Sequence, residues 1–271
     1  MNEPSLNSGI SSVAPHGHVA IDNVEIVFGA GRNRTHAVAP TTIELGPGTF
    51  TALIGPSGCG KSTLMNAVAG FVAPSAGVIR IDDEPVKGPN PEVGIIFQQY
   101  ALFPWFTALG NVKFALKRFG LARAEEERRA RLALAEVGLE GQERKYPGQL
   151  SGGMKQRVAI ARTFSGAPKL LLMDEPFGAL DAQTRITMHD LLMGVWEAHK
   201  ATVLFITHDV DEALILADRI HVMSQAPGRI IETFDITEPR PRSLADFGHE
   251  QLRLRSEIHR LLRSTHQTNP A

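Results

Sequence analysis

The chain has 271 residues, a formal net charge of −1 and a hydrophobic fraction of 43%. This length and composition are typical of one large globular domain, alone or with a small satellite. The near-zero charge excludes a strongly basic protein, so no nucleic-acid partner is expected. No apolar run approaches the roughly 18–20 residues that span a bilayer, and we expect neither a membrane span nor a secretion signal. The one cysteine, Cys59, excludes an internal disulfide bond and fits a reducing cytoplasm.

The first part of the chain is predicted to form a tail and then short strands. Residues 1–18 are rich in Ser, Asn, Gly and Pro, which is typical of a flexible tail. Alternating apolar residues predict a strand over Val19–Phe28 and a further one over Thr41–Leu45, with a hairpin loop at Gly29–Thr35. A short buried strand is expected at Phe50–Ile54.

The middle and end of the chain alternate between strands and helices. Strands are expected at Gly77–Ile81 and Val93–Phe97, before a mostly helical stretch from about Thr107 to Gly166. The elements expected after it are a strand at Lys169–Met173, a helix from Asp181, a strand at Thr202–Ile206, a helix from Asp209 and a strand at Arg219–Ser224. This alternation favours an α/β fold, with helices packed on a parallel or mixed sheet and a helical subdomain inserted at about residues 100–166.

A glycine-rich loop lies between the strand at Phe50–Ile54 and a helix expected over Lys61–Gly70. It matches the phosphate-loop pattern G-x-x-x-x-G-K-[ST] at every position. Glycines let successive backbone N–H groups converge on phosphate oxygens, and the helix N-terminus adds partial positive charge. Lys61 is expected to neutralise the β- and γ-phosphates and the Ser62 hydroxyl to hold Mg²⁺. The residues expected to bind ATP here are Gly55, Pro56, Ser57, Gly58, Cys59, Gly60, Lys61, Ser62 and Thr63.

A phosphate loop alone also suits a kinase or a GTPase. The sequence has no Asn-Lys-x-Asp motif for reading guanine, which argues against a GTPase. The apolar run Leu170–Met173 ends in Asp174 and Glu175. Beside the loop strand, Asp174 is expected to reach Mg²⁺ through water, and Glu175 to accept a proton from water that attacks the γ-phosphate. The alternative is that this acidic pair only begins a loop.

A second anion cradle is predicted at Leu150-Ser-Gly-Gly-Met154, before a helix. Ser151 offers a hydroxyl, and Gly152 and Gly153 offer backbone amides at a helix N-terminus. One fold cannot easily bring this cradle onto its own phosphate loop. We therefore expect a symmetric head-to-tail dimer, in which each ATP lies between one loop and the Ser151 cradle of a second copy.

These motifs, in this order, resemble the ATP-binding cassette (ABC) family over about residues 19–232. The resemblance implies that Gln98 contacts Mg²⁺ and the attacking water, and that His208 contacts the γ-phosphate. It also implies that Phe28 stacks on adenine; the alternative is that it is a core residue at a strand end. Met154 replaces the glutamine that is most common after Leu-Ser-Gly-Gly, but the hydroxyl and amides of the cradle remain.

The resemblance assigns roles and boundaries to the whole chain. The predicted catalytic residues are Glu175, His208, Gln98 and Lys61; the predicted Mg²⁺ ligands are Ser62, Gln98 and Asp174; and the predicted nucleotide contacts add Phe28, Ser151 and Gly153 to the phosphate loop. Residues 176–181 correspond to the D-loop, which crosses the dimer interface. The ATPase domain spans 19–240, with a P-loop NTPase core, an N-terminal antiparallel β subdomain and the helical insert. Residues 241–271 form an amphipathic helical extension, with Leu254, Ile258 and Leu261 on one face.

Further segments resemble the bacterial importers of nitrate, sulfonate and taurine, namely Phe103-Pro-Trp105, residues 174–181 and residues 224–230. The resemblance implies an ATPase at the cytoplasmic face of the inner membrane, attached peripherally to separate permease subunits. A periplasmic or extracellular solute-binding protein would act with it indirectly. Tyr100–Trp105 is expected to receive a short helix of the permease, or else these residues only pack the helical subdomain. The transported solute does not contact the ATPase subunit, so the sequence of this subunit does not identify the solute.

Two other classes of protein are considered. A DNA-repair or chromosome-organising cassette carries long coiled-coil insertions, and the segment between Ser62 and Ser151 is too short and lacks sustained heptads. A non-hydrolysing module that only dimerises on ATP would not need Glu175 and His208, which are both present. An importer ATPase that uses ATP and Mg²⁺ is therefore the favoured interpretation.

Overall fold

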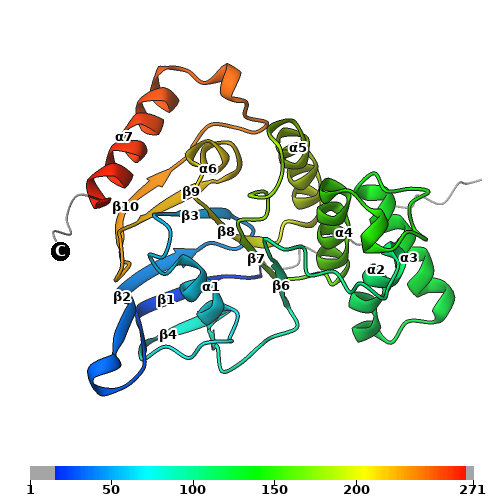
Figure 1. Cartoon of the computed structure of the whole chain (residues 1–271), viewed down its shortest axis with the longest axis horizontal. Helices are drawn as coiled ribbons and strands as arrows, with labels where there is room; N and C mark the ends of the chain where they lie inside the picture. Colours follow the sequence, from blue (N-terminus) through cyan, green and yellow to red (C-terminus); the bar gives the residue numbers. More distant parts are fainter. Residues whose placement is uncertain (1–15, 267–271) are drawn as a thin grey trace, which may run out of the picture.

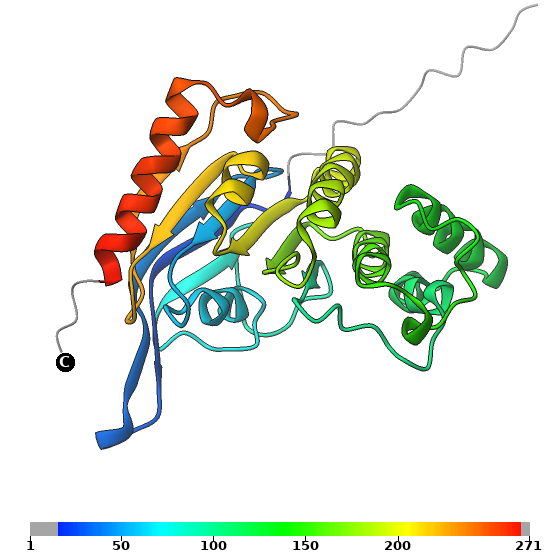
Figure 2. The same ribbon diagram turned by 45° about the horizontal axis from the view of Figure 1, so that its top comes forward.

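The structure is a computed structural model that describes residues 16–266. A four-stranded antiparallel sheet comes first, in the order β2-β1-β4-β5. Its strands are β1 (Val19–Phe28), β2 (Thr35–Leu45), β4 (Ala76–Ile81) and β5 (Glu84–Pro85). The hairpin of β1 and β2 encloses the short 3-10 helix Gly31–Asn33 and projects from the body of the molecule (Figure 2). The expected antiparallel β subdomain is therefore present.

A six-stranded sheet forms the centre, in the order β10-β9-β3-β8-β7-β6. Its strands are β3 (Phe50–Ile54), β6 (Val93–Ile96), β7 (Leu170–Asp174), β8 (Thr202–Thr207), β9 (Arg219–Met223) and β10 (Ile230–Asp235). All neighbouring pairs are parallel except β9 with β10. This is the mixed sheet expected for an α/β fold.

Apolar side chains cover both faces of the central sheet. Along β7 the two faces alternate: Leu171 and Met173 belong to one buried cluster, and Leu170 and Leu172 belong to the other. The strands β3 and β8 divide their side chains in the same way. A sheet buried on both faces needs near-continuous apolar runs, which explains why these strands were visible as short hydrophobic segments.

Seven α-helices surround the sheets within the described residues. They are α1 (Lys61–Val68), α2 (Ala108–Leu116), α3 (Arg123–Glu136), α4 (Gly152–Ser165), α5 (Ala182–His199), α6 (Val210–Leu216) and α7 (His249–His266), with 3-10 turns at Lys117–Phe119, Pro147–Gln149 and Leu244–Asp246. Figure 1 shows α2, α3 and α4 gathered at one end of the molecule, and α7 beside β10 at the other end. None of the helices in residues 16–266 is long and apolar enough to cross a membrane.

Polar groups fix where the central strands begin. The carboxylate of Asp218 accepts a hydrogen bond from the backbone N–H of Phe50, with an Oδ2–N distance of 2.8 Å. The hydroxyl of Thr202 accepts one from the backbone N–H of Gly48, also at 2.8 Å. These bonds join β3 to the residues at the start of β8 and β9, at the edge opposite the loops that follow the strands.

One sequence expectation for a strand was wrong, and two strands were missed. β2 begins at Thr35 and not at Thr41, because its first residues pair with β1 beyond the apolar core. β10 was not predicted, because this edge strand is mostly exposed or half-buried and its polar residues break the apolar pattern. The two-residue strand β5 was also missed. The described part of the predicted tail starts at residue 16, so the rest of that prediction lies outside the described residues.

Candidate functional site

The ends of four parallel strands meet at one edge of the central sheet. Ile54 at the end of β3 pairs with Thr207 of β8, and Asp174 at the end of β7 pairs with Ile206 of the same strand. Ile96 of β6 pairs with Met173. The predicted residues follow directly after these strands, so the register brings them to one place. This edge is where parallel α/β sheets bind their ligands.

The glycine-rich loop leaves β3 and enters α1 through a left-handed residue. Gly60 has φ of +106°, and a Cβ at this position would lie 2.5 Å from the backbone oxygen of Ala37. Only glycine adopts this conformation without strain and without a clash. The loop therefore reaches the N-terminus of α1 with its backbone close to the neighbouring strand β2.

Lys61 is the first residue of α1 and is only 5% exposed. Its Nζ donates hydrogen bonds to the backbone oxygens of Gly55 and Pro56, each at 2.8 Å, and lies 3.7 Å from Sγ of Cys59. No carboxylate in the described part of the chain forms an ion pair with it. A buried ammonium that has only neutral partners is suited to an anion placed over the loop.

Ser62 and Asp174 form the polar group next to the loop. The Ser62 hydroxyl donates to Oδ1 of Asp174 at 3.1 Å. Burial raises the pKa of the Asp174 carboxyl; the bond from Ser62 opposes this shift and the charge of Glu175 adds to it. A hydroxyl and a carboxylate are the oxygen donors that Mg²⁺ takes, and it completes its shell with water and phosphate. No group of three or more His, Cys, Asp and Glu side chains suited to a metal occurs in residues 16–266.

Glu175, His208 and Gln98 come together beside this pair. Oε2 of Glu175 lies 3.2 Å from Nδ1 of His208. Glu175 has φ of +44°, and its backbone N–H donates to Ile206 at 2.9 Å. A Cβ on Gly178 would lie 3.4 Å from Nε2 of Gln98 and 3.7 Å from Oε2 of Glu175, which places the amide and the carboxylate on the same small patch. Glu175 therefore lies close to His208, and shares the surroundings of Gly178 with Gln98, although the three residues follow three different strands.

The second predicted cradle lies elsewhere. Ser151 is the N-cap of α4, and its hydroxyl accepts a hydrogen bond from the backbone N–H of Met154 at 3.3 Å. Ser151 and Gly152 are exposed, whereas the Met154 side chain packs against the main core cluster. In Figure 1, α4 lies across β6 and β7 from α1. The cradle is therefore open at the surface and is not part of the group assembled around Lys61.

Phe28 lies at the end of β1, next to the turn of the projecting hairpin, and is 46% exposed. The alternative that it is a buried core residue was wrong. Thr63 lies in the first turn of α1, half-buried.

An aromatic surface, defined here as Phe103, Trp105, Phe106 and Phe114, covers the segment after Gln98. The ring centroids of Phe103 and Phe114 are 4.6 Å apart, and Trp105 is 66% exposed. Leu102 instead packs against the core, so the alternative of simple packing holds for that residue.

Two polar residues that hold the aromatic surface in place were not predicted from the sequence. Asn111 is completely buried; its Oδ1 accepts from Phe103 N, and its Nδ2 donates to the backbone oxygens of Phe103, Phe106 and Thr107. Arg162 donates to the backbone oxygen of Ala101 at 2.7 Å and lies over the Phe103 ring. A buried asparagine in an apolar helix is the signal that could have been noticed, because such a side chain needs partners.

The family model for the ABC transporter matches residues 38–178, which covers the phosphate loop, the Ser151 cradle and the acidic pair. The chain belongs to the ABC transporter family. It is an ATP-hydrolysing subunit, as the motifs predicted, and its P-loop NTPase fold is confirmed.

Proteins with similar sequences are described as ATP-binding proteins. A putative ATP-binding protein of Brucella abortus is 51% identical over 203 residues, covering 75% of this chain and 78% of that protein. A taurine import ATP-binding protein of Chromobacterium violaceum is 50% identical, covering 73% and 76%. A nitrate import ATP-binding protein of Synechocystis is 44% identical, covering 82% and 84%. These relatives confirm the expected importer subfamily for this ABC ATPase.

Solved structures agree with the ABC fold. A dimeric ATP-binding cassette in a post-hydrolysis state, bound to ADP and Pi, superposes with a TM-score of 0.72 and 30% identity, covering 82% of this chain and 100% of that chain. The protein cbiO1 of Clostridium perfringens, part of the ABC transporter complex cbiONQ, gives a TM-score of 0.75 with 28% identity, covering 93% of this chain and 98% of that chain.

Proposed function

We propose that two copies of this ABC ATPase enclose two molecules of ATP and use their hydrolysis to drive uptake of a small anionic or zwitterionic solute of the nitrate, sulfonate or taurine type. The observation that carries the catalytic part is the convergence of Lys61, Asp174, Glu175 and His208 at one sheet edge. The solute class rests on the similarity to the taurine and nitrate import ATP-binding proteins.

Each residue of the site has its own role in the proposed ATP hydrolysis. Lys61 and the backbone amides of the loop bind the phosphates. Ser62, Asp174 and Gln98 would hold Mg²⁺, which would supply positive charge to neutralise the phosphates. Glu175 accepts a proton from the attacking water, and its neighbour His208 contacts the γ-phosphate. Phe28, exposed on its hairpin, stacks on the adenine ring.

The active site is shared between two copies in this proposal. Ser151 and Gly153 lie at an exposed helix N-terminus away from Lys61, which is the arrangement needed to bind the γ-phosphate of a neighbour's ATP. Closure of the dimer on ATP and its reopening after hydrolysis would be passed to permease subunits through the aromatic surface, where Trp105 is the most exposed anchor. The subunit would then act at the cytoplasmic face of the inner membrane, with a solute-binding protein on the other side.

The shared site is tested by mixing two defective chains. Ser151→Arg blocks the cradle and Lys61→Ala removes the phosphate ligand, so neither homodimer has an intact site. A mixed dimer has one site made of two intact halves, and is expected to recover hydrolysis that both homodimers lack. Phosphate release from the mixture is compared with that of each chain alone. No recovery, with mixed dimers demonstrated by differently tagged chains, would contradict the shared site.

A further inference from the structure

The helix α6 begins immediately after His208. Asp209 is its N-cap, and Oδ1 of Asp209 accepts hydrogen bonds from the backbone N–H groups of Asp211 at 2.9 Å and Glu212 at 3.3 Å. Such a cap fixes the direction in which the chain enters a helix. The position of His208 therefore depends on where α6 is held.

Buried polar contacts join α6 rigidly to Thr207 and Asp209, the residues on either side of His208. Glu212 is 5% exposed, and its Oε2 accepts from the Thr207 hydroxyl at 2.6 Å. The same hydroxyl accepts from the backbone N–H of Asp209 at 3.0 Å. Oε1 of Glu212 lies 3.6 Å from Nε of Arg185, whose Nη2 donates to the backbone oxygen of Leu180 in the D-loop. A shift of α6 would thus displace the residues on both sides of His208.

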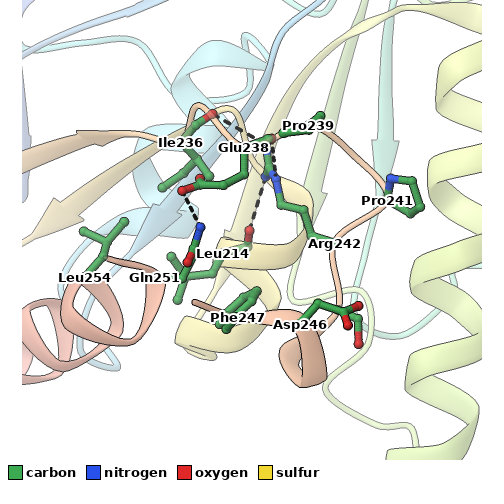
Figure 3. A pocket seen from close by; sticks show the side chains of 11 residues that line it. Leu214, Ile236, Glu238, Pro239, Pro241, Arg242, Asp246, Phe247, Gln251 and Leu254 are labelled. Atoms are coloured by element: carbon green, nitrogen blue, oxygen red, sulfur yellow. Dashed lines mark hydrogen bonds between the residues drawn. The ribbon is translucent and has the colours of Figure 1, made fainter. Parts of the chain in front are cut away.

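The Pro-Arg-Pro-Arg segment after β10 holds the C-terminal end of α6. Nη1 of Arg242 donates to the backbone oxygens of Ala217 at 2.5 Å and Leu214 at 3.2 Å, and Nη2 of Arg240 donates to Leu216 at 2.6 Å. The last carbonyls of a helix have no partners within it, so these guanidinium groups satisfy them. Figure 3 shows the Arg242 side chain reaching the Leu214 carbonyl.

The helix α7 holds the opposite end of α6. Nε and Nη2 of Arg255 donate to the two carboxylate oxygens of Asp211, at 2.5 and 2.7 Å. Two parallel bonds of this kind fix orientation as well as distance. Ile258, one turn further along α7, is completely buried in the main core cluster, so α7 is itself anchored.

We propose that the C-terminal extension is a clamp that positions His208 against Glu175 by holding α6 at both ends. Arg255 and Arg242 are positioning residues in this arrangement, and neither touches the nucleotide site. The inference rests on the proposed roles of His208 and Glu175. Because the clamp acts on the reacting groups and not on the loop at Lys61, it governs the rate of hydrolysis more than the affinity for ATP.

The test uses the full chain and steady-state ATP hydrolysis. Arg255→Met is expected to lower kcat about tenfold, because small displacements of reacting groups have large effects on rate. KM for ATP and the unfolding temperature should stay close to the wild-type values. Asp211→Asn removes the charge and one of the two acceptor oxygens, so it should lower kcat in the same direction. Arg255→Lys keeps the charge but can make only one of the two parallel bonds, so it should recover only part of the rate. The control is Arg260→Met on the same helix, since Arg260 is 72% exposed and its carboxylate partner, Glu257 at 3.8 Å, also belongs to α7.

Two further variants separate this inference from the proposed site. His208→Ala should abolish most hydrolysis, and adding Arg255→Met to it should cause no further loss, because the clamp acts through His208. If His208→Ala hydrolyses ATP normally, the proposed site is wrong. If His208→Ala is inactive while Arg255→Met and Asp211→Asn keep wild-type kcat, the site stands and the clamp is overturned. The clamp is also overturned if the losses of the double variant multiply, or if KM rises in proportion to the fall in kcat.

Discussion

Oε2 of Glu175 lies 3.2 Å from Nδ1 of His208, although the two residues follow different strands, β7 and β8. The pairing of Asp174 with Ile206 brings the ends of the two strands together, so that Glu175 follows β7 close to where His208 follows β8. A carboxylate beside an imidazole can hold it in one orientation.

Glu175→Gln tests the general base. The amide keeps the size of the side chain but cannot accept a proton from water, so hydrolysis is expected to fall about 10²–10⁴-fold while ATP still binds. ATP-bound chains should then accumulate as dimers, which size-exclusion chromatography with Mg-ATP would detect. Glu140→Gln, at an exposed position, is the matched control. Normal turnover in Glu175→Gln would rule out the assignment.

Lys61→Ala tests the phosphate contact. The buried ammonium has only backbone and thiol partners in the described structure, so its removal should leave the fold intact but abolish most Mg-ATP binding. Isothermal calorimetry measures the binding, and the unfolding temperature checks the fold. Lys87→Ala removes an exposed lysine as the control. Tight binding by Lys61→Ala would contradict the role given to this residue.

Asn111→Ala tests the support of the aromatic surface. The change leaves a buried N–H and several backbone oxygens without their partner, which costs about 2 kcal/mol of the free energy of unfolding. Urea unfolding gives the difference, with the exposed Asn90→Ala as control.

Trp105→Ala should leave the free energy of unfolding unchanged, because the indole is exposed, but should weaken attachment to permease subunits. A stability loss in Trp105→Ala as large as that in Asn111→Ala would contradict this separation.

His221 on β9 predicts a specific dependence of stability on pH. Burial, with the nearby charge of Arg219, lowers the pKa of this imidazole to about 4. The unfolded chain, with an ordinary histidine pKa near 6.5, binds more protons between these values, so the free energy of unfolding falls as the pH falls from about 6.5 to 4.

Between pH 7 and pH 5 His221 should contribute a loss of about 2 kcal/mol, which His221→Gln removes. Urea unfolding at the two pH values measures the loss, and His259→Gln at an exposed site should not change it. An unaltered pH dependence in His221→Gln would refute the assignment.

Much of the fold and the site could be predicted because local rules determine them. The phosphate loop needs glycine at Gly60 and an apolar strand before it, and both are visible in the sequence. The acidic pair and His208 follow apolar runs in the same way. Contacts between distant segments could not be predicted, since nothing local indicates that Arg255 meets Asp211 or that Asn111 binds the Phe103 backbone.

The polar bonds at the start of the central strands have a consequence for protein engineering. Both faces of the sheet are apolar, so a slip of β8 along β3 by one residue would leave side chains such as Leu204 and Phe205 buried in apolar surroundings. Burial of apolar side chains therefore discriminates poorly between alternative registers of β3 and β8. The hydrogen bond from Gly48 to Thr202, at the opposite edge of the sheet, fixes the register instead. A design that moves these catalytic loops onto another parallel sheet would therefore need to include this hydrogen bond. Without it, a shift in strand register would separate Glu175 from His208.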